Sequence, residues 1–259
     1  MNWQGSRRWW PWTALGLLSL FGLVSVPAYP VHQPLAPPSL TLLGGADLLG
    51  RDLFILALGA LRRTLTDVLI AFGIASVLAV GSATLASTHW ASTRHLSRSA
   101  IGGITAIPPL LVALLAARLL AETGMEISLA LALVSWPRLF KLIDAEVQSL
   151  RVEPYWLVTT ALGLPWRARI SRYLTPAVLR ALGRIFPMEL MELIALHATL
   201  AFLGAGALSP ESSIGRLIAS GRAFLSYAPW MFWTPVLILS LALTLLLAAA
   251  STQANERTP

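Results

Sequence analysis

The sequence contains no cysteine, only one lysine and few charged side chains of any kind. Without cysteine, disulfides, thiol catalysis and thiolate metal sites are excluded. Charged residues make up 12% of the chain, whereas soluble domains average about 25%. Hydrophobic residues make up 56%, and the mean hydropathy is +0.70. A soluble globular protein is therefore not expected, and uncharged runs of about 20 residues predict membrane spans.

Motifs for nucleotide binding and hydrolysis are also absent. The only lysine, Lys141, precedes Leu142, so the chain has no phosphate-binding Gly-x-x-x-x-Gly-Lys-[Ser/Thr] loop. No His-Glu-x-x-His zinc motif and no Gly-x-Ser-x-Gly nucleophile elbow occurs. His32, His89 and His95 have no partner cluster and are predicted to be solvated. We predict no catalytic residue, no metal site and, because no basic stripe carries interleaved aromatics, no nucleic-acid partner.

Six apolar stretches predict an all-α, polytopic membrane protein with six transmembrane helices. The predicted spans cover residues 9–31, 67–94, 99–117, 127–142, 185–208 and 230–255. Val26-Pro27-Ala28 resembles a signal-peptide cleavage site, whose use would leave the remaining topology unchanged. Between the spans, 30–38 and 44–52 are predicted loops, 53–63 an amphipathic helix and 209–222 a polar loop.

The distribution of positive charge predicts which side of the membrane each loop faces. With six spans both termini lie on one side, and thirteen of the nineteen Lys and Arg residues lie on that side. The positive-inside rule therefore predicts cytoplasmic termini, N-in and C-in, in a multi-pass protein of the inner membrane. We divide the chain into residues 1–64, with the first span, the Gly/Asp loop and the amphipathic helix, and residues 65–255, the main transmembrane domain.

The segment Arg138–Arg184 carries eight of the nineteen basic residues between hydrophobic blocks. A short helix is predicted over Tyr155–Leu164. The run Gly163-Leu164-Pro165 ends it, because glycine suits a helix C-terminus and proline cannot continue a helix. A second helix, Trp166–Leu174, is predicted to end before Pro176. Two interpretations fit this cytoplasmic segment: a docking element for a groove on a partner protein, or an amphipathic pair lying on anionic lipid.

These residues carry a family resemblance. Tyr155, Ala161-Leu162-Gly163 and Pro176 resemble the cytoplasmic "EAA" loop of permease subunits from ABC importers. Gly45–Asp52 is similar to the Gly-Thr-Asp-x-x-Gly-Arg-Asp loop of the second permease of the oligopeptide/dipeptide/nickel group, with Ala46 for threonine. Further similar segments follow in order, at 106–113, 132–137, 202–206, 214–215 and 228–230.

The resemblance implies a transporter subunit that carries no cofactor of its own. It implies a heterodimer with a homologous permease, two cytoplasmic ATPase subunits that bind ATP and Mg, and an extracytoplasmic solute-binding protein, in the bacterial inner membrane. Peptides, nickel or other metal chelates, and small cationic solutes are the implied cargo. Within the permease domain, residues 65–255, the coupling loop spans about 150–176. Its implied ATPase-docking residues are Tyr155, Thr160, Ala161, Leu162, Gly163, Leu164 and Pro165. The extracytoplasmic loop carries Asp47, Gly50, Arg51 and Asp52.

The sequence departs from the family pattern at one position of the loop. The glutamate of the motif falls on Leu157, and its two alanines fall on Val158 and Thr159. If that carboxylate anchors the loop in relatives, coupling is weaker or differently arranged here.

Ionisable residues interrupt the fifth span. Glu189 and Glu192 share one helix face, and His197 lies within about 80° of Glu189 around the axis. One interpretation places the glutamates in the first turns after Pro187, paired with Arg180 or Arg184. The other makes Glu189, Glu192 and His197 lining groups of a translocation pathway, together with Pro108 and Pro109 of the third span.

Two alternatives to an importer subunit follow from the same residues. A self-contained ion-coupled secondary transporter or channel would use the membrane carboxylates as ion sites, but the chain shows no internal repeat and the basic segment would have no role. Within the ABC class, an exporter of a small cation is the other alternative, because these residues do not encode the direction of transport.

Overall fold

A computed structural model describes residues 32–86, 102–103, 105–120, 125–206 and 213–255. The described residues form helices joined by turns, with two isolated β-bridges and no strand. The all-α prediction is thus confirmed for this part of the chain. The named elements are α2 (Leu53–Ala86), α4 (Pro109–Leu119), α5 (Glu126–Val152), α6 (Pro154–Ala161), α7 (Trp166–Arg169), η2 (Ile170–Leu174), α8 (Thr175–Phe202), α9 (Ile214–Gly221), η4 (Arg222–Phe224) and α10 (Trp230–Asn255).

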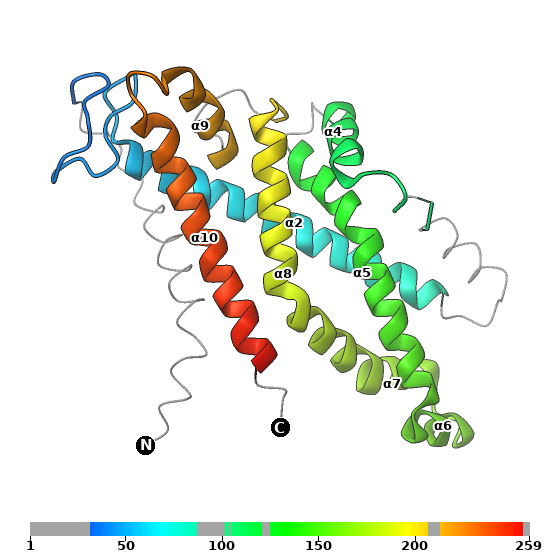
Figure 1. Ribbon diagram of the computed structural model, residues 1–259. Helices are drawn as coiled ribbons and strands as arrows, with labels where there is room; N and C mark the ends of the chain where they lie inside the picture. Colours follow the sequence, from blue (N-terminus) through cyan, green and yellow to red (C-terminus); the bar gives the residue numbers. More distant parts are fainter. Residues whose placement is uncertain (1–31, 87–101, 104, 121–124, 207–212, 256–259) are drawn as a thin grey trace, which may run out of the picture.

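The long helices run between two ends of the molecule, and each end carries its own short helix (Figure 1). One end carries α6 and the C-terminal end of α10. The opposite end carries α9 and the loop of residues 32–52. Helix α2 runs obliquely across α10, α8 and α5 and packs against all three.

Three helices in the described part of the chain are long and apolar enough to cross a membrane: Leu53–Thr84, Ile170–Phe202 and Trp230–Ser251. They correspond to the predicted second, fifth and sixth spans. The first predicted span lies outside the described residues, and the number of six spans and the N-in/C-in orientation remain predictions. Helix α5 contains the predicted fourth span but continues for ten residues beyond it, to Val152.

The predicted break between an amphipathic helix at 53–63 and a span from Asp67 is wrong. Helix α2 is continuous over 34 residues, about 51 Å at 1.5 Å per residue. Asp52 starts it by accepting hydrogen bonds from the backbone N–H of Phe54 (2.8 Å) and Ile55 (3.3 Å). Beyond that start, no proline or helix-ending motif interrupts the sequence, so the charged residues at 62–63 remain helical.

The prediction of Pro108 and Pro109 inside a third span is also wrong. Pro108 lies immediately before α4, and Pro109 is its first residue. Proline is favoured there because the first N–H groups of a helix have no intrahelical acceptor. Helix α4 has 11 residues, about 16 Å, and is too short to cross a hydrocarbon core of about 30 Å.

Helix α8 begins well before the predicted fifth span. Pro187 is inside the helix rather than at its start, and Pro176 lies in its first turn rather than ending the preceding helix. The π-helical turn η2 connects α7 to α8 without a break. Because α7, η2 and α8 are continuous, the helix extends from the basic segment into the apolar core.

Small residues allow close packing of the helices. Ala71, Ala75, Ala79 and Ala83 repeat every four residues along α2, and all are fully buried. The predicted polar loop at 209–222 instead contains α9, whose first turn is capped by Ser213. A Cβ on Gly215 of α9 would lie 2.2 Å from the Ala198 carbonyl oxygen, so glycine is what lets α9 touch α8.

Candidate functional site

The loop at the α9 end is fixed by its own polar residues. The Asp47 carboxylate accepts hydrogen bonds from the backbone N–H groups of Leu49 (2.9 Å) and Arg51 (2.8 Å), and from Arg51 Nε (2.7 Å). Gly50 has φ +73°, and a Cβ there would lie 2.2 Å from the His32 carbonyl oxygen. With Asp52 capping α2, the four predicted loop residues lie together and maintain the shape of the loop.

The predicted docking residues form a knuckle at the other end, which we define as residues 154–169 (Figure 1). Helix α6 includes Tyr155, Thr160 and Ala161. Gly163 then adopts φ +71°, in the left-handed region that favours glycine. The Leu164 N–H donates to the Thr159 carbonyl (3.1 Å). Leu162 and Pro165 complete the turn, and α7 starts at Trp166.

Aromatic contacts connect the two sides of the knuckle. The rings of Tyr155 and Tyr173 stack with their centroids 5.4 Å apart. The Arg169 guanidinium lies over the Trp156 ring at 5.5 Å, and Trp156 is buried. Leu157, at the position of the missing glutamate, points outward and is 57% exposed. These contacts join α6 to α7 and η2 without a carboxylate at position 157.

A charged cluster joins α5 to α8. The Arg138 guanidinium pairs with Glu189 (Nη2 to Oε1, 3.0 Å) and with Glu192. Ser135 Oγ donates to Glu189 Oε1 at 2.5 Å. The predicted pairing of the glutamates with Arg180 or Arg184 is therefore wrong. Because α8 starts earlier than predicted, Arg184 faces Glu146 of α5 instead, at 3.0 Å.

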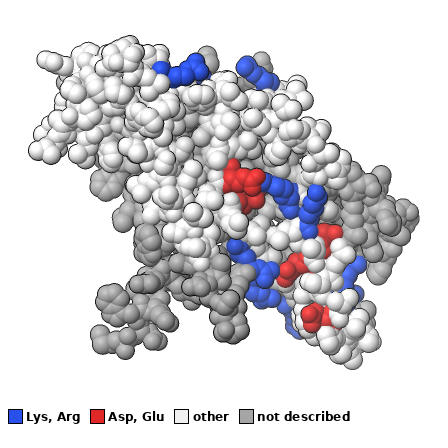
Figure 2. Space-filling view, viewed as in Figure 1, with Lys and Arg blue, Asp and Glu red and all other residues white. Residues whose placement is uncertain are grey.

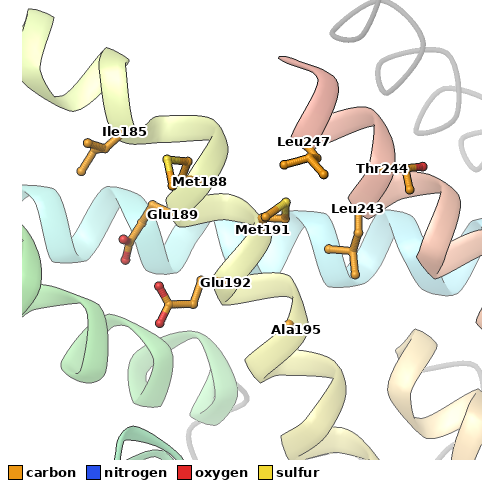
Figure 3. Close-up of a pocket in the computed structure, with 9 residues that line it drawn as sticks. All are labelled: Ile185, Met188, Glu189, Met191, Glu192, Ala195, Leu243, Thr244 and Leu247. Atoms are coloured by element: carbon orange, nitrogen blue, oxygen red, sulfur yellow. The ribbon is translucent and has the colours of Figure 1, made fainter. Parts of the chain in front are cut away.

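Glu189 and Glu192 lie at the edge of a groove of about 700 Å³ between α8 and α10. Figure 3 shows both carboxylates pointing away from α10 and toward α5. The rest of the lining is mainly apolar: Ile185, Met188, Met191, Ala195, Leu243, Thr244 and Leu247. Figure 2 shows a patch of acidic atoms directly beside basic ones in the middle of the viewed face.

Arg138 also borders a second, smaller cavity of about 100 Å³. Thr105, Ile107, Pro109, Val112, Val134 and Pro137 line it with Arg138. Arg138 therefore lies between Pro109 on one side and the two glutamates on the other. Sequence analysis placed Arg138 only within the predicted fourth span and at the start of the basic segment, without a partner. The signal it missed is that an arginine this close to an apolar span needs carboxylate partners.

His197 lies apart from this cluster. It is fully buried, and its Nε2 is 3.0 Å from Asp67 Oδ2 of α2. Asp67 also accepts a hydrogen bond from Ser128 Oγ of α5 at 3.4 Å. The pair thus connects three helices, and His197 is not among the residues that line the groove. A pathway role for His197 would require a conformation that exposes it.

No group of three or more His, Cys, Asp or Glu side chains positioned to hold a metal occurs in the ranges that the structure describes. Several of their acidic residues and His197 instead pair with side chains on other helices, as at Arg138–Glu189, Arg184–Glu146 and His197–Asp67. The candidate site therefore consists of two parts: the knuckle, and the groove with its Arg138–Glu189–Glu192 cluster.

The chain is similar to known permease proteins. A putative peptide permease protein of Brucella ovis is 26% identical over 84% of this chain and 78% of its own length. The oligopeptide transport system permease proteins OppC of Haemophilus influenzae and Bacillus subtilis are 26% and 23% identical over 77% of this chain. The matches span 64% and 65% of those proteins, just under two thirds. No family model matches the chain.

A crystal structure of an amino acid ABC transporter with histidines contains a chain with the same fold. The TM-score is 0.58 at 18% sequence identity, over 78% of this chain and 92% of that one. This likeness shows the fold alone. The resemblance that the motifs indicated is confirmed by the sequence relatives, which are peptide and oligopeptide permease proteins.

Proposed function

We propose that this chain is the membrane-spanning permease subunit of an ATP-driven ABC importer in the bacterial inner membrane, with peptides as its cargo. It would pair with a homologous permease, two cytoplasmic ATPases and an extracytoplasmic solute-binding protein. Peptides are favoured over nickel chelates or other small cations because the relatives reported above are peptide or oligopeptide permeases.

One observation carries this proposal: a helix–Gly–helix knuckle projects at one end of the chain, at the position where the motifs resemble the ABC coupling loop. The chain has no phosphate-binding loop of its own, so ATP-driven transport requires an ATPase partner. Most basic atoms on the visible face lie over the half of the molecule that carries the knuckle (Figure 2). This distribution supports a cytoplasmic knuckle.

The proposed mechanism is alternating access. Closure of the ATPase dimer on ATP would move the knuckle, and the two permeases would then rock relative to one another. Helices α5 and α8 flank the knuckle, and they are connected by Arg184–Glu146 and by Arg138–Glu189. Because ion pairs join α5 and α8 at two positions along their length, the two helices would move together. The groove edge at Glu192, which is 56% exposed, would face the pathway during this motion.

The test is reconstitution of the full assembly. The chain is co-expressed with the partner permease, ATPases and binding protein of its own organism and placed in proteoliposomes. We expect ATP-dependent accumulation of a labelled oligopeptide, with a nickel–histidine chelate tested in parallel. Matched vesicles that contain a hydrolysis-deficient ATPase provide the control.

The alternatives predict different results in the same assay. Accumulation by this chain alone, driven by a proton or sodium gradient, would show a secondary transporter. ATP-driven transport of solute from the side of the membrane that carries the ATPases to the opposite side would show an exporter. Uptake of the chelate but not of the peptide would keep the ABC assignment and change the cargo.

A further inference from the structure

The knuckle exposes large apolar side chains. Leu157, Val158 and Leu162 are 57%, 55% and 72% exposed. They lie on α6 and directly after it, where family members have a glutamate at the position of Leu157. No charged residue occurs between Glu153 and Arg167. The projecting tip of the molecule is therefore uncharged and apolar, which predicts that another surface covers it.

Lipid hydrocarbon lies too far away to be that surface. Helix α5 continues for ten residues beyond Leu142, the end of the predicted fourth span, which is about 15 Å of helix before the knuckle begins. Asp144, Glu146 and Arg151 occupy this interval. The polar interface of a bilayer adds only about 5–8 Å on each side of the hydrocarbon core. The knuckle thus projects beyond it, and its apolar tip fits a protein surface.

The tip is also held in one shape before docking. The Tyr155–Tyr173 stack and the Arg169–Trp156 contact fix α6 on η2 and α7. An element that is ordered in advance loses less conformational entropy on binding. The aromatic contacts therefore replace, within this chain, the anchoring that a carboxylate would supply through the partner.

Arg172 of η2 is exposed and directly precedes Tyr173, whose ring stacks on Tyr155 of α6. Resting on the proposed function, we propose that the ATPase socket for this knuckle has an apolar floor that receives Leu157, Val158 and Leu162, and an acidic rim that faces Arg172. Apolar burial carries the affinity, and the rim charges contribute to orientation. An ion pair at the position of the family glutamate has no part in this docking.

The two contributions differ in size and in salt dependence. Burial of one leucine side chain changes affinity by roughly tenfold to a hundredfold, so Leu162→Asn lowers ATPase affinity at least tenfold at every salt concentration. An exposed ion pair changes affinity by at most about fivefold. Arg172→Gln therefore has a small effect, and it disappears near 1 M salt, where the Debye length is about 3 Å.

Site-directed labelling provides the test, because the chain contains no cysteine. The variant Leu162→Cys carries an environment-sensitive fluorophore, in nanodiscs with the partner permease, and is measured with and without the purified ATPases. Leu203→Cys, 51% exposed and at the C-terminal end of α8, is the matched control. We expect a blue shift at Leu162 only when ATPases are present, which persists in 1 M salt, and no change at Leu203.

Each other outcome overturns the proposal in a distinguishable way. A blue shift before ATPases are added means that lipid covers the tip. ATPases that bind while the Leu162 label remains in water, or that dissociate in high salt, show that polar contacts carry docking, and the proposed function survives. Failure of the ATPases to bind the unlabelled assembly removes the proposed function as well.

Discussion

Arg138 of α5 and Glu189 of α8 lie 3.0 Å apart, although 51 positions separate them in the sequence. The two helices precede and follow the knuckle in the chain. This ion pair therefore holds them together outside the knuckle. Glu189 is buried and also accepts a hydrogen bond from Ser135. The pair therefore combines an interhelical connection with the polar edge of the groove.

Removal of Arg138 should destabilise the protein more than removal of an exposed arginine. Arg138→Gln leaves the buried Glu189 carboxylate without its cation, which costs about 3 kcal/mol. Thermal unfolding of the purified protein in detergent measures the effect. Arg180→Gln, an exposed arginine on α8, is the control and should stay within about 0.5 kcal/mol of the wild type.

The double variant Arg138→Gln/Glu189→Gln checks the cause. Because the second change removes the unpaired charge, it should recover a large part of the lost stability. Additive losses from the two single changes would show that the ion pair is not the source of the effect.

His197 and Glu192 should respond differently to substitution. His197 is fully buried against Asp67, so His197→Ala removes a packed ring and leaves the Asp67 carboxylate with the weaker hydrogen bond from Ser128. We expect a loss of about 3 kcal/mol in stability, with uptake per folded transporter largely retained. Purified protein at matched amounts, assayed for both melting and peptide uptake, separates the two quantities.

Glu192 lies at the open edge of the groove, so Glu192→Gln should change stability by less than about 1 kcal/mol. If the groove edge faces the pathway, peptide uptake should fall several-fold. Wild-type uptake by both variants would remove Glu192 and His197 from the pathway. Reduced uptake by stable His197→Ala would instead support the predicted pathway role of His197.

Sequence patterns located the features that depend on local chemistry. Glycine at position 163 and the uncharged run from Trp230 to Asn255 predicted the turn of the knuckle and α10. Sequence patterns gave wrong helix boundaries where a residue type occurs in two structural contexts, as proline does at the start of a helix and inside one. Proline suits the first turn of a helix, which predicts a helix start at Pro187, yet Pro187 lies inside α8. For Arg138 the sequence indicates that a carboxylate partner is needed, but not which one, because Arg138 and Glu189 meet only when α5 and α8 pack together.

The turn of the knuckle should be sensitive to the backbone at Gly163. A Cβ at this position meets no atom within 4 Å, so any effect of Gly163→Ala arises from φ +71°. Alanine in this conformation costs about 1 kcal/mol. We expect little change in global melting, but a lower ratio of peptide transported to ATP hydrolysed.

Gly183→Ala is the matched control for this change. Gly183 lies inside α8 and also has no neighbour near a Cβ. Alanine is favoured over glycine by about 1 kcal/mol inside a helix, so this variant should be equally or more stable, with wild-type coupling. Identical behaviour of the two alanine variants would contradict a specific role for the turn.

Substitution of Gly215 in α9 tests the packing of α9 on α8, because the two possible effects on protein stability have opposite signs. Ile214 N–H donates to Thr64 Oγ1 of α2 at 3.2 Å, while Gly215 touches the backbone of Ala198 in α8. Helix propensity alone predicts that Gly215→Ala stabilises the protein by about 1 kcal/mol. The added Cβ, 2.2 Å from the Ala198 carbonyl oxygen, instead forces α9 away from α8, and overpacking of this kind costs about 1–3 kcal/mol. We therefore expect net destabilisation in thermal unfolding. Gly59→Ala in α2, where a Cβ meets nothing within 4 Å, should be stabilising. Stabilisation at both positions would mean that α9 does not pack on α8 as described.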